Sequence, residues 1–309
     1  MTNKALIRSY TYTALAMALT FCLTSQADQF SITFGAPGQQ TPSSTVVNNA
    51  EIFGIETFDT RPLGNHGFTT GFTTECKNCN QIIGTYSLGA NIEAANVFGG
   101  AGGTGRFVTA FGTSTAQQGP NSYTLTLTTP PGINRPGDNY FGLWISALDA
   151  GNFLTFEENG TPVGTFTPSD LIDALGACRG LGGIGGSGIG NERYCGNPNP
   201  PFSTSTAGSN STSTSRGNRN EQYAFVNFVD ETGTFNEVIV TQNSSLAGSG
   251  GPNYESDNQS VGFCRNPRAC ITGTPIHPVP EPSTWSLFGI GFAIAGVACR
   301  RRKWPGVQA

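Results

Sequence analysis

Three acidic side chains come closest to a catalytic acid/base pair in this chain. Asp149, Glu157 and Glu158 could supply the two carboxylates that flank a glycosidic bond during hydrolysis. Nothing in the sequence fixes the distance between them, and acidic residues at the ends of strands are usually solvated. A secreted hydrolase is therefore the least favoured of the functions that the sequence allows.

Histidine and glycine motifs give no stronger catalytic signal. A Ser-His-Asp or Cys-His arrangement would depend on His66 alone, because the second histidine, His277, lies in a Pro-rich segment near the C-terminus. Residues 100–105 and 183–188 match the dinucleotide-binding pattern G-x-G-x-x-G. Neither opens a helix after a strand, so we interpret both as turns. We therefore predict no enzyme activity, no catalytic residue and no cofactor-binding residue.

Calcium is the metal that the sequence best accommodates. Two loops, residues 149–152 and Asp257-Asn258, offer oxygen ligands of the kind that Ca²⁺ prefers. Neither loop has the ligand series of an EF-hand, and the histidines cannot complete a metal cluster. We predict no metal ligand, and a structural calcium ion is left as an alternative.

Six cysteines between the two ends of the chain are expected to form disulfides. They are Cys76, Cys79, Cys178, Cys195, Cys264 and Cys270. An even number favours disulfide bonds in a protein that works outside the cytoplasm, and of the fifteen possible connectivities we favour the local pairs 76–79, 178–195 and 264–270. For the first pair, a redox or zinc motif is the alternative. A redox site would need a helix that starts at the first cysteine, whereas residues 81–86 are typical of a strand, and zinc would need two further ligands.

Composition favours an all-β fold around these residues. The chain has 42 Gly, 19 Pro and 12% charged residues, which is typical of a protein with many turns. Period-two alternation in residues 123–128 predicts a strand with one buried face, and the apolar run 140–145 predicts a strand covered on both faces. Further strands are expected at residues 52–58, 81–87, 94–97, 106–111, 153–156, 163–166, 223–229, 235–241 and 254–263. About ten short strands at this spacing predict one antiparallel β-sandwich, jelly-roll-like, at residues 51–270.

Two segments lie beside this pattern. Residues 30–34 alternate and are expected as an outlying strand within an N-terminal segment, residues 28–50. Residues 169–175 are expected as one short helix, with Thr167 or Ser169 as its N-cap.

Two insertions interrupt it. Residues 180–190 are Gly-rich and residues 203–219 are Ser/Thr-rich, and such compositions are typical of flexible loops. The second insertion could be O-glycosylated, although a plain linker is favoured.

The N-terminus has the layout of a signal peptide. Two cations, Lys4 and Arg8, precede an apolar run, and the small residues that follow predict cleavage after Ala27, so that residues 1–27 are removed. A lipoprotein site at Cys22 is a weaker alternative, because a phenylalanine precedes that cysteine.

The C-terminus combines three features. They are the rigid tripeptide Pro280, Glu281 and Pro282, the apolar run 285–299, and the cations Arg300, Arg301, Arg302 and Lys303. As a helix the apolar run would be about 22 Å long, shorter than the roughly 30 Å hydrocarbon core, so we expect it to cross a membrane but to anchor weakly. The four cations predict that the end of the chain stays in the cytoplasm.

These residues resemble the PEP-CTERM protein-sorting signal, which is also labelled the ice-binding protein C-terminal domain. The resemblance depends on the Pro-Glu-Pro triplet, the apolar span with Gly289, Gly291 and Gly296, and the cation cluster, and it covers residues 280–303. It implies processing by exosortase, a membrane enzyme, and display at the surface of Gram-negative bacteria. It identifies a destination and no activity.

The body of the chain resembles a group of exosortase-dependent surface proteins with β-sandwich ectodomains. The similar segments are residues 99–105, 140–152, 223–228 and 255–258. No catalytic residues are assigned to that group, so the resemblance implies none here. The cysteine loops and the Ser/Thr-rich insertion depart from its pattern.

The leading interpretation is an exported, exosortase-sorted protein of the cell surface or extracellular matrix, without catalytic activity. The alternative is a carbohydrate-binding module that holds an exopolysaccharide through exposed Tyr and Trp side chains. Residues 28–279 contain 19 acidic and 10 basic residues, and this net negative charge disfavours nucleic acid as a partner. The expected partners are signal peptidase, exosortase and the membrane, with residues 271–279 as a linker to residues 285–299.

Overall fold

The computed structural model describes the body of the chain and neither of its ends. The described residues are 30–78, 80–96, 99–110, 122–134, 137–146, 148, 151–176, 178, 194–196, 222–242 and 254–276. The predicted signal peptide, both predicted insertions and the predicted sorting segment lie outside these residues.

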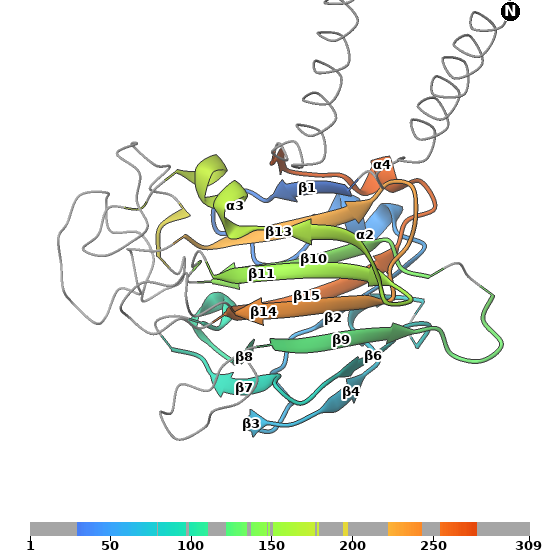
Figure 1. Cartoon of the computed structure of the whole chain (residues 1–309), viewed down its shortest axis with the longest axis horizontal. Helices are drawn as coiled ribbons and strands as arrows, with labels where there is room; N and C mark the ends of the chain where they lie inside the picture. The colour runs from blue at the N-terminus through green and yellow to red at the C-terminus, as the bar shows by residue number, and fades with distance from the viewer. Residues whose placement is uncertain are drawn as a thin grey trace, which may run out of the picture.

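Two antiparallel sheets make up the fold (Figure 1). The six-stranded sheet has the order β12 (Thr161–Phe166), β11 (Asn152–Glu158), β14 (Glu237–Gln242), β9 (Ser122–Thr128), β6 (Ile83–Tyr86) and β4 (Phe68–Thr70). The ten-stranded sheet has the order β16 (Thr274–Pro275), β1 (Phe30–Phe34), β13 (Ala224–Asp230), β10 (Tyr140–Ser146), β15 (Glu255–Phe263), β8 (Arg106–Thr109), β7 (Asn91–Ala94) and β3 (Gly64–Asn65). Its two remaining strands are β2 (Ile52–Glu56), which pairs with β15, and β5 (Thr74–Lys77), which pairs with β2.

Eight consecutive strands pair in a nested order. Strand β8 pairs with β15, β9 with β14, β10 with β13, and β11 with β12, so the innermost pair is a hairpin and each further pair encloses it. The pairs alternate between the two sheets, as they do when one long hairpin is rolled up on itself. This is the topology of a jelly roll, and it confirms the all-β, antiparallel expectation.

One aromatic-rich core joins the two sheets. Phe156 of β11 lies 5.0 Å from Phe228 of β13 and 5.8 Å from Phe141 of β10, measured between ring centroids. On β9, Tyr123, Leu125 and Leu127 are buried while the residues between them are not, as the period-two pattern predicts. The two sheets therefore pack face to face in a sandwich-like arrangement.

A second layer covers the outer face of the ten-stranded sheet. Helices α2 (Ser44–Asn49) and α4 (Pro267–Cys270) lie over β10 and β13, and a buried cluster joins them to the sheet (Figure 1). Its buried members are Val46, Ala50, Phe53, Ile55, Tyr140, Val229, Cys264 and Cys270. We call α2, α4 and this cluster the α2–α4 layer. It covers Tyr140 of β10, whereas Trp144 of the same strand is buried in a separate cluster with Tyr223 and Phe225. Together with the core between the sheets, these clusters bury all seven residues of β10.

The boundaries of the fold differ from the expected ones. Strand β1, expected as an outlying strand, pairs with β13 along its whole length, so the described fold begins at residue 30 rather than 51. Strand β7 lies three residues before the predicted strand 94–97. Helix α3 (Pro168–Leu175) is present as expected, with Thr167 as its N-cap.

Candidate functional site

The edge of the ten-stranded sheet holds both ends of the described chain. Strand β16 runs antiparallel to β1, with Phe34 opposite Thr274 and Thr33 opposite Pro275. The next residue, Ile276, donates its backbone N–H to the carbonyl oxygen of Ile32 at 2.9 Å, and its side chain is only 3% exposed. The fold is therefore entered and left at neighbouring positions on one edge.

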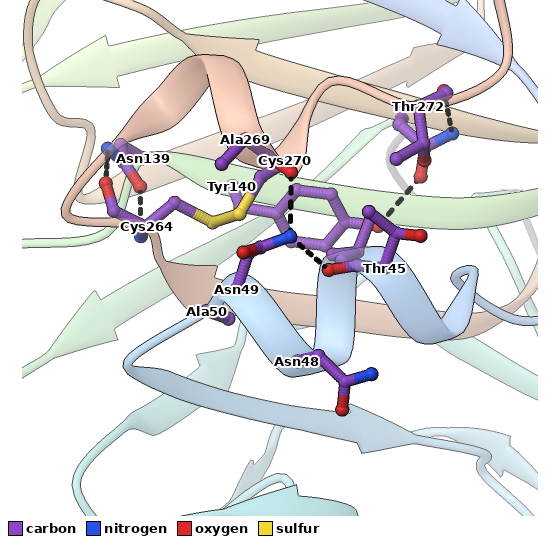
Figure 2. Close-up of a disulfide and its surroundings, with 12 residues drawn as sticks. Thr45, Asn48, Asn49, Ala50, Asn139, Tyr140, Cys264, Ala269, Cys270 and Thr272 are labelled. Carbon is purple, nitrogen blue, oxygen red and sulfur yellow. Dashed lines mark hydrogen bonds between the residues drawn. A yellow bond between two sulfur atoms is a disulfide. The ribbon is translucent and has the colours of Figure 1, made fainter.

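A short segment, residues 264–276, leads the chain to this edge, and we call it the C-terminal strap. A disulfide joins Cys264 to Cys270, which confirms that predicted pair. Asn139 holds the start of the strap, because its side-chain amide donates to the carbonyl oxygen of Cys264 at 2.9 Å and accepts from the backbone N–H of the same residue at 2.7 Å (Figure 2).

The middle of the C-terminal strap is also held by hydrogen bonds from distant parts of the chain. The hydroxyl of Thr33, in β1, donates to the carbonyl oxygen of Thr272. On the other side of the strap, the side-chain amide of Asn49, at the end of α2, donates to the carbonyl oxygen of Ala269 at 3.1 Å (Figure 2). Both contacts join the C-terminal strap to parts of the chain that are more than 200 residues earlier in the sequence.

Most of the described cations lie around the α2–α4 layer. Arg265 pairs with Glu51 at 2.9 Å and Arg268 with Glu231 at 3.1 Å, and both arginine side chains are more than three-quarters exposed. Lys77 donates to the carbonyl oxygen of Asn48, near the end of α2, at 2.9 Å. Three of the five described Lys and Arg residues therefore gather here, although the body as a whole is acidic.

The other predicted disulfides agree with the structure as far as it extends. Cys178 is bonded to Cys195, and their Cα atoms are 5.6 Å apart. Cys76 is disulfide-bonded. Cys79, its predicted partner, lies outside the described residues.

Of the three acidic residues considered for hydrolysis, the structure describes Glu157 and Glu158. Glu157 and Glu158 lie at one end of β11, and as consecutive strand residues they point to opposite faces of the sheet. Burial raises the pKa of Glu158, and its carboxylate accepts from the side-chain amide of Asn159 at 2.9 Å. Asp149 lies outside the described residues.

Asp257, considered as a calcium ligand, is instead a buried structural acid. One carboxylate oxygen accepts from the backbone N–H of Ala101 at 2.7 Å, and the other from that of Asn258 at 2.6 Å. Burial raises the pKa of Asp257 to about 8, with smaller contributions in the same direction from Asp59 and Glu56. Within the described ranges, no three His, Cys, Asp or Glu side chains lie close enough together to hold a metal ion.

The aromatic side chains expected for glycan binding are inside the protein. Every Tyr and Trp in the described part of the chain is buried, namely Tyr86, Tyr123, Tyr140, Tyr194, Tyr223, Tyr254 and Trp144. His66 is exposed and lies between β3 and β4, with its Nε2 atom 2.7 Å from the carbonyl oxygen of Leu63. The described surface therefore presents no tyrosine or tryptophan platform for a sugar ring.

One polar pair inside the sandwich was missed from the sequence. Asn152 of β11 and Gln242 of β14 are cross-strand neighbours, both at most 1% exposed. Neither side-chain amide has a hydrogen-bond partner for its oxygen or its nitrogen. The alternation of β14 could have placed Gln242 inside, because it follows the buried Val238 and Val240 at the same period of two.

Comparison with known proteins identifies the C-terminal segment. The PEP-CTERM protein-sorting motif matches residues 278–303, which begin two residues after the buried Ile276. The motif places the chain in the class of proteins that exosortase sorts for export to the cell envelope. The chain accordingly carries a PEP-CTERM sorting motif in this segment, as the resemblance of these residues implied.

The comparisons with curated proteins and with solved structures gave no match. None of the helices between residues 30 and 276 that the structure describes is long and apolar enough to cross a bilayer, and the predicted span, residues 285–299, lies outside that part.

Proposed function

We propose that this chain is an exported protein of the cell surface or extracellular matrix that has no catalytic activity of its own. The PEP-CTERM motif at residues 278–303 is the observation that carries the proposal. The sorting motif would direct the precursor to exosortase, and the sandwich would be the part that is displayed.

Several features of the body support this role. A predicted signal peptide that ends at Ala27 leaves two residues before β1 begins at Phe30, so its removal would not disturb the fold. Disulfides are typical of proteins that work in oxidising compartments, and Cys178–Cys195 and Cys264–Cys270 are of this kind. The membrane anchor at residues 285–299 is part of the proposal.

Burial of the described tyrosines and of Trp144 weighs against carbohydrate binding through an aromatic platform. A glycan array with the mature ectodomain tests that alternative. Sub-millimolar affinity for one class of polysaccharide would favour a binding module over a structural role.

Replacement of Pro280, Glu281 and Pro282 with alanine tests the sorting function. We expect the variant to accumulate in the inner membrane at the mass of the unprocessed C-terminus, whereas the wild type reaches the surface with a smaller mass. His277→Ala, just outside the matched motif, is the control and should be processed as the wild type. Unchanged mass and surface display of the triple variant would contradict the proposal.

A further inference from the structure

The folded body ends very close to the sorting motif. Ile276 packs in the main core and is hydrogen-bonded to Ile32, so it is a fixed point of the sandwich. The apolar run of the sorting segment begins at Trp285, nine residues later. Even fully extended, at roughly 3.6 Å per residue, the chain between them can reach at most about 32 Å.

That reach is smaller than the width of the sandwich. In the ten-stranded sheet, seven strand spacings separate β16 from β3, and at about 4.8 Å each they amount to roughly 34 Å. A chain that leaves the fold at β16 cannot pass around the body and still let the β3 edge face the membrane. In Figure 1, β1 and α4 lie at the top of the molecule, and β3 and β4 lie at the bottom.

We propose that in the membrane-inserted precursor the sandwich stands with its β1–β16 edge and the adjoining α2–α4 layer against the outer surface of the bilayer. The partner of this surface is the lipid headgroup layer. The inference rests on the proposed function, because it requires residues 285–299 to be inserted.

The charges of this region fit a phospholipid surface. Arg265, Arg268 and Lys77 lie around the α2–α4 layer, and the two arginine side chains are 81% and 78% exposed. Because Arg265 pairs with Glu51 and Arg268 with Glu231, the charges of this region are locally balanced, and anionic lipids should repel it less than the acidic rest of the body. The short tether, rather than charge, therefore sets the orientation. At the far edge, Leu63 is 52% exposed beside β3, which makes it a convenient reporter position.

The test measures how close each edge lies to lipid in the full-length precursor reconstituted into liposomes. Thr45→Cys, on the exposed side of α2, and Leu63→Cys, beside β3, are each labelled with a fluorophore. The lipids, phosphatidylcholine with or without phosphatidylglycerol, carry nitroxide headgroups that quench a nearby label. We expect quenching at position 45 to exceed that at position 63 several-fold in both lipid compositions.

A variant with a longer segment between Ile276 and Trp285 tests whether the length of this segment causes the difference in quenching. Insertion of twelve Gly and Ser residues after Ile276 should bring the two quenching values close together, since the body can then turn freely. Equal quenching without the insertion, stronger quenching at position 63, or a ratio that the insertion leaves unchanged would each overturn the orientation. Flotation with the liposomes distinguishes the two proposals: a precursor that does not float overturns the membrane anchor and this orientation together, whereas one that floats with equal quenching overturns the orientation alone.

Discussion

The backbone N–H of Ile276 donates to the carbonyl oxygen of Ile32 across 2.9 Å, which ties the last described residue to the first described strand. Strand β1 has β13 on its other side, so it is paired on both edges for part of its length. An unpaired edge strand invites pairing with another chain. The C-terminal strap therefore completes the sheet and covers the edge that the N-terminal strand would otherwise expose.

Truncation of Ile276 should weaken this closure. Ile276→Ala removes most of a side chain that is buried in the main core, and such changes typically cost about 2–5 kcal/mol of the free energy of unfolding. Urea unfolding of the mature ectodomain measures the effect. Thr274→Ala, two residues earlier in β16 and exposed, is the matched control and should change the free energy by less than about 0.5 kcal/mol. Equal effects of the two substitutions would show that Ile276 is not packed in the core as described.

Removal of the strap disulfide should also destabilise the fold. The Cys264–Cys270 bond closes a loop with a sequence separation of 6, for which the chain-entropy estimate is about 2 kcal/mol. Alanine at both positions keeps the buried site apolar, so the loss should come mainly from the crosslink. We expect a lower urea midpoint and faster proteolysis within residues 264–276.

The second described disulfide provides a comparison for that experiment. Alanine at Cys178 and Cys195 should lower the midpoint as well, but it should leave the proteolysis of residues 264–276 unchanged, because that bond lies elsewhere in the chain. Accelerated cleavage of the strap in both double variants would contradict a local role for the Cys264–Cys270 bond.

Strands with a strong local pattern were predictable from the sequence. Residues 123–128 alternate between apolar and polar and form β9, and the uninterrupted apolar run at 140–145 forms β10, which is covered on both faces. The predicted strands at 153–156 and 163–166 form the hairpin of β11 and β12, whose tip, Asn159-Gly160, has positive φ at both residues, a backbone geometry that few other dipeptides adopt readily. In these elements the local sequence and the tertiary environment favour the same structure.

Elements without such a pattern were missed. Helix α2 has six residues and α4 has four, too few to show a helical period, and both form because they cover the apolar outer face of the ten-stranded sheet. Strand β7 begins at Asn91, a residue type that is rare in strands, and the side chain of Asn91 is used there to donate to Thr109 in β8. The positions of α2, α4 and β7 therefore depend on contacts with residues far away in the sequence.

In the candidate site, too, features with a local sequence pattern were predictable, and features that depend on distant pairing were not. The sorting motif was found because it is a linear pattern of residue types, and the favoured local cysteine pairs needed no knowledge of the fold. The edge formed by β1 and β16 was not predicted, since its strands are about 240 residues apart and β16 has only two residues. Proximity of the two ends is a property of the fold alone.

Removal of the buried amide pair should stabilise the sandwich. A buried polar group without a partner costs about 1–3 kcal/mol, and Asn152 and Gln242 both lack partners. The double substitution Asn152→Leu and Gln242→Leu should therefore raise the free energy of unfolding, which urea denaturation measures. A decrease would mean that a water cluster or a ligand hydrogen-bonds to these amides in solution.

Asn227→Leu is the matched control for the amide pair. Asn227 is also buried, at 1% exposure, but its side chain accepts from the hydroxyl of Tyr140 at 2.8 Å and donates to that of Thr33 at 3.2 Å. Its replacement leaves two buried hydroxyl groups with one partner fewer, so it should destabilise the protein. The opposite signs expected for Asn227 and for the amide pair separate the effect of hydrogen bonding from that of polarity.

The stability of the fold should depend on pH through Asp257. Its pKa is raised to about 8 in the folded protein, well above the usual value of about 4 in an unfolded chain. Between these two values the folded state keeps a proton that the unfolded state has released. The contribution of Asp257 is therefore fully present below about pH 4, decreases as the pH rises, and levels off above about pH 8.

Asp257→Asn should remove this dependence, because an amide does not titrate. Asparagine keeps one side-chain oxygen, so only one of the N–H groups of Ala101 and Asn258 retains its acceptor, and the variant should be less stable than the wild type at pH 5. As the pH rises toward 8 the wild type loses stability through the proton linkage and the variant does not, so the difference between their unfolding midpoints should shrink. Midpoints measured at pH 5, 6, 7 and 8 check this expectation, and two curves that stay parallel over the whole range would show that Asp257 does not titrate in it.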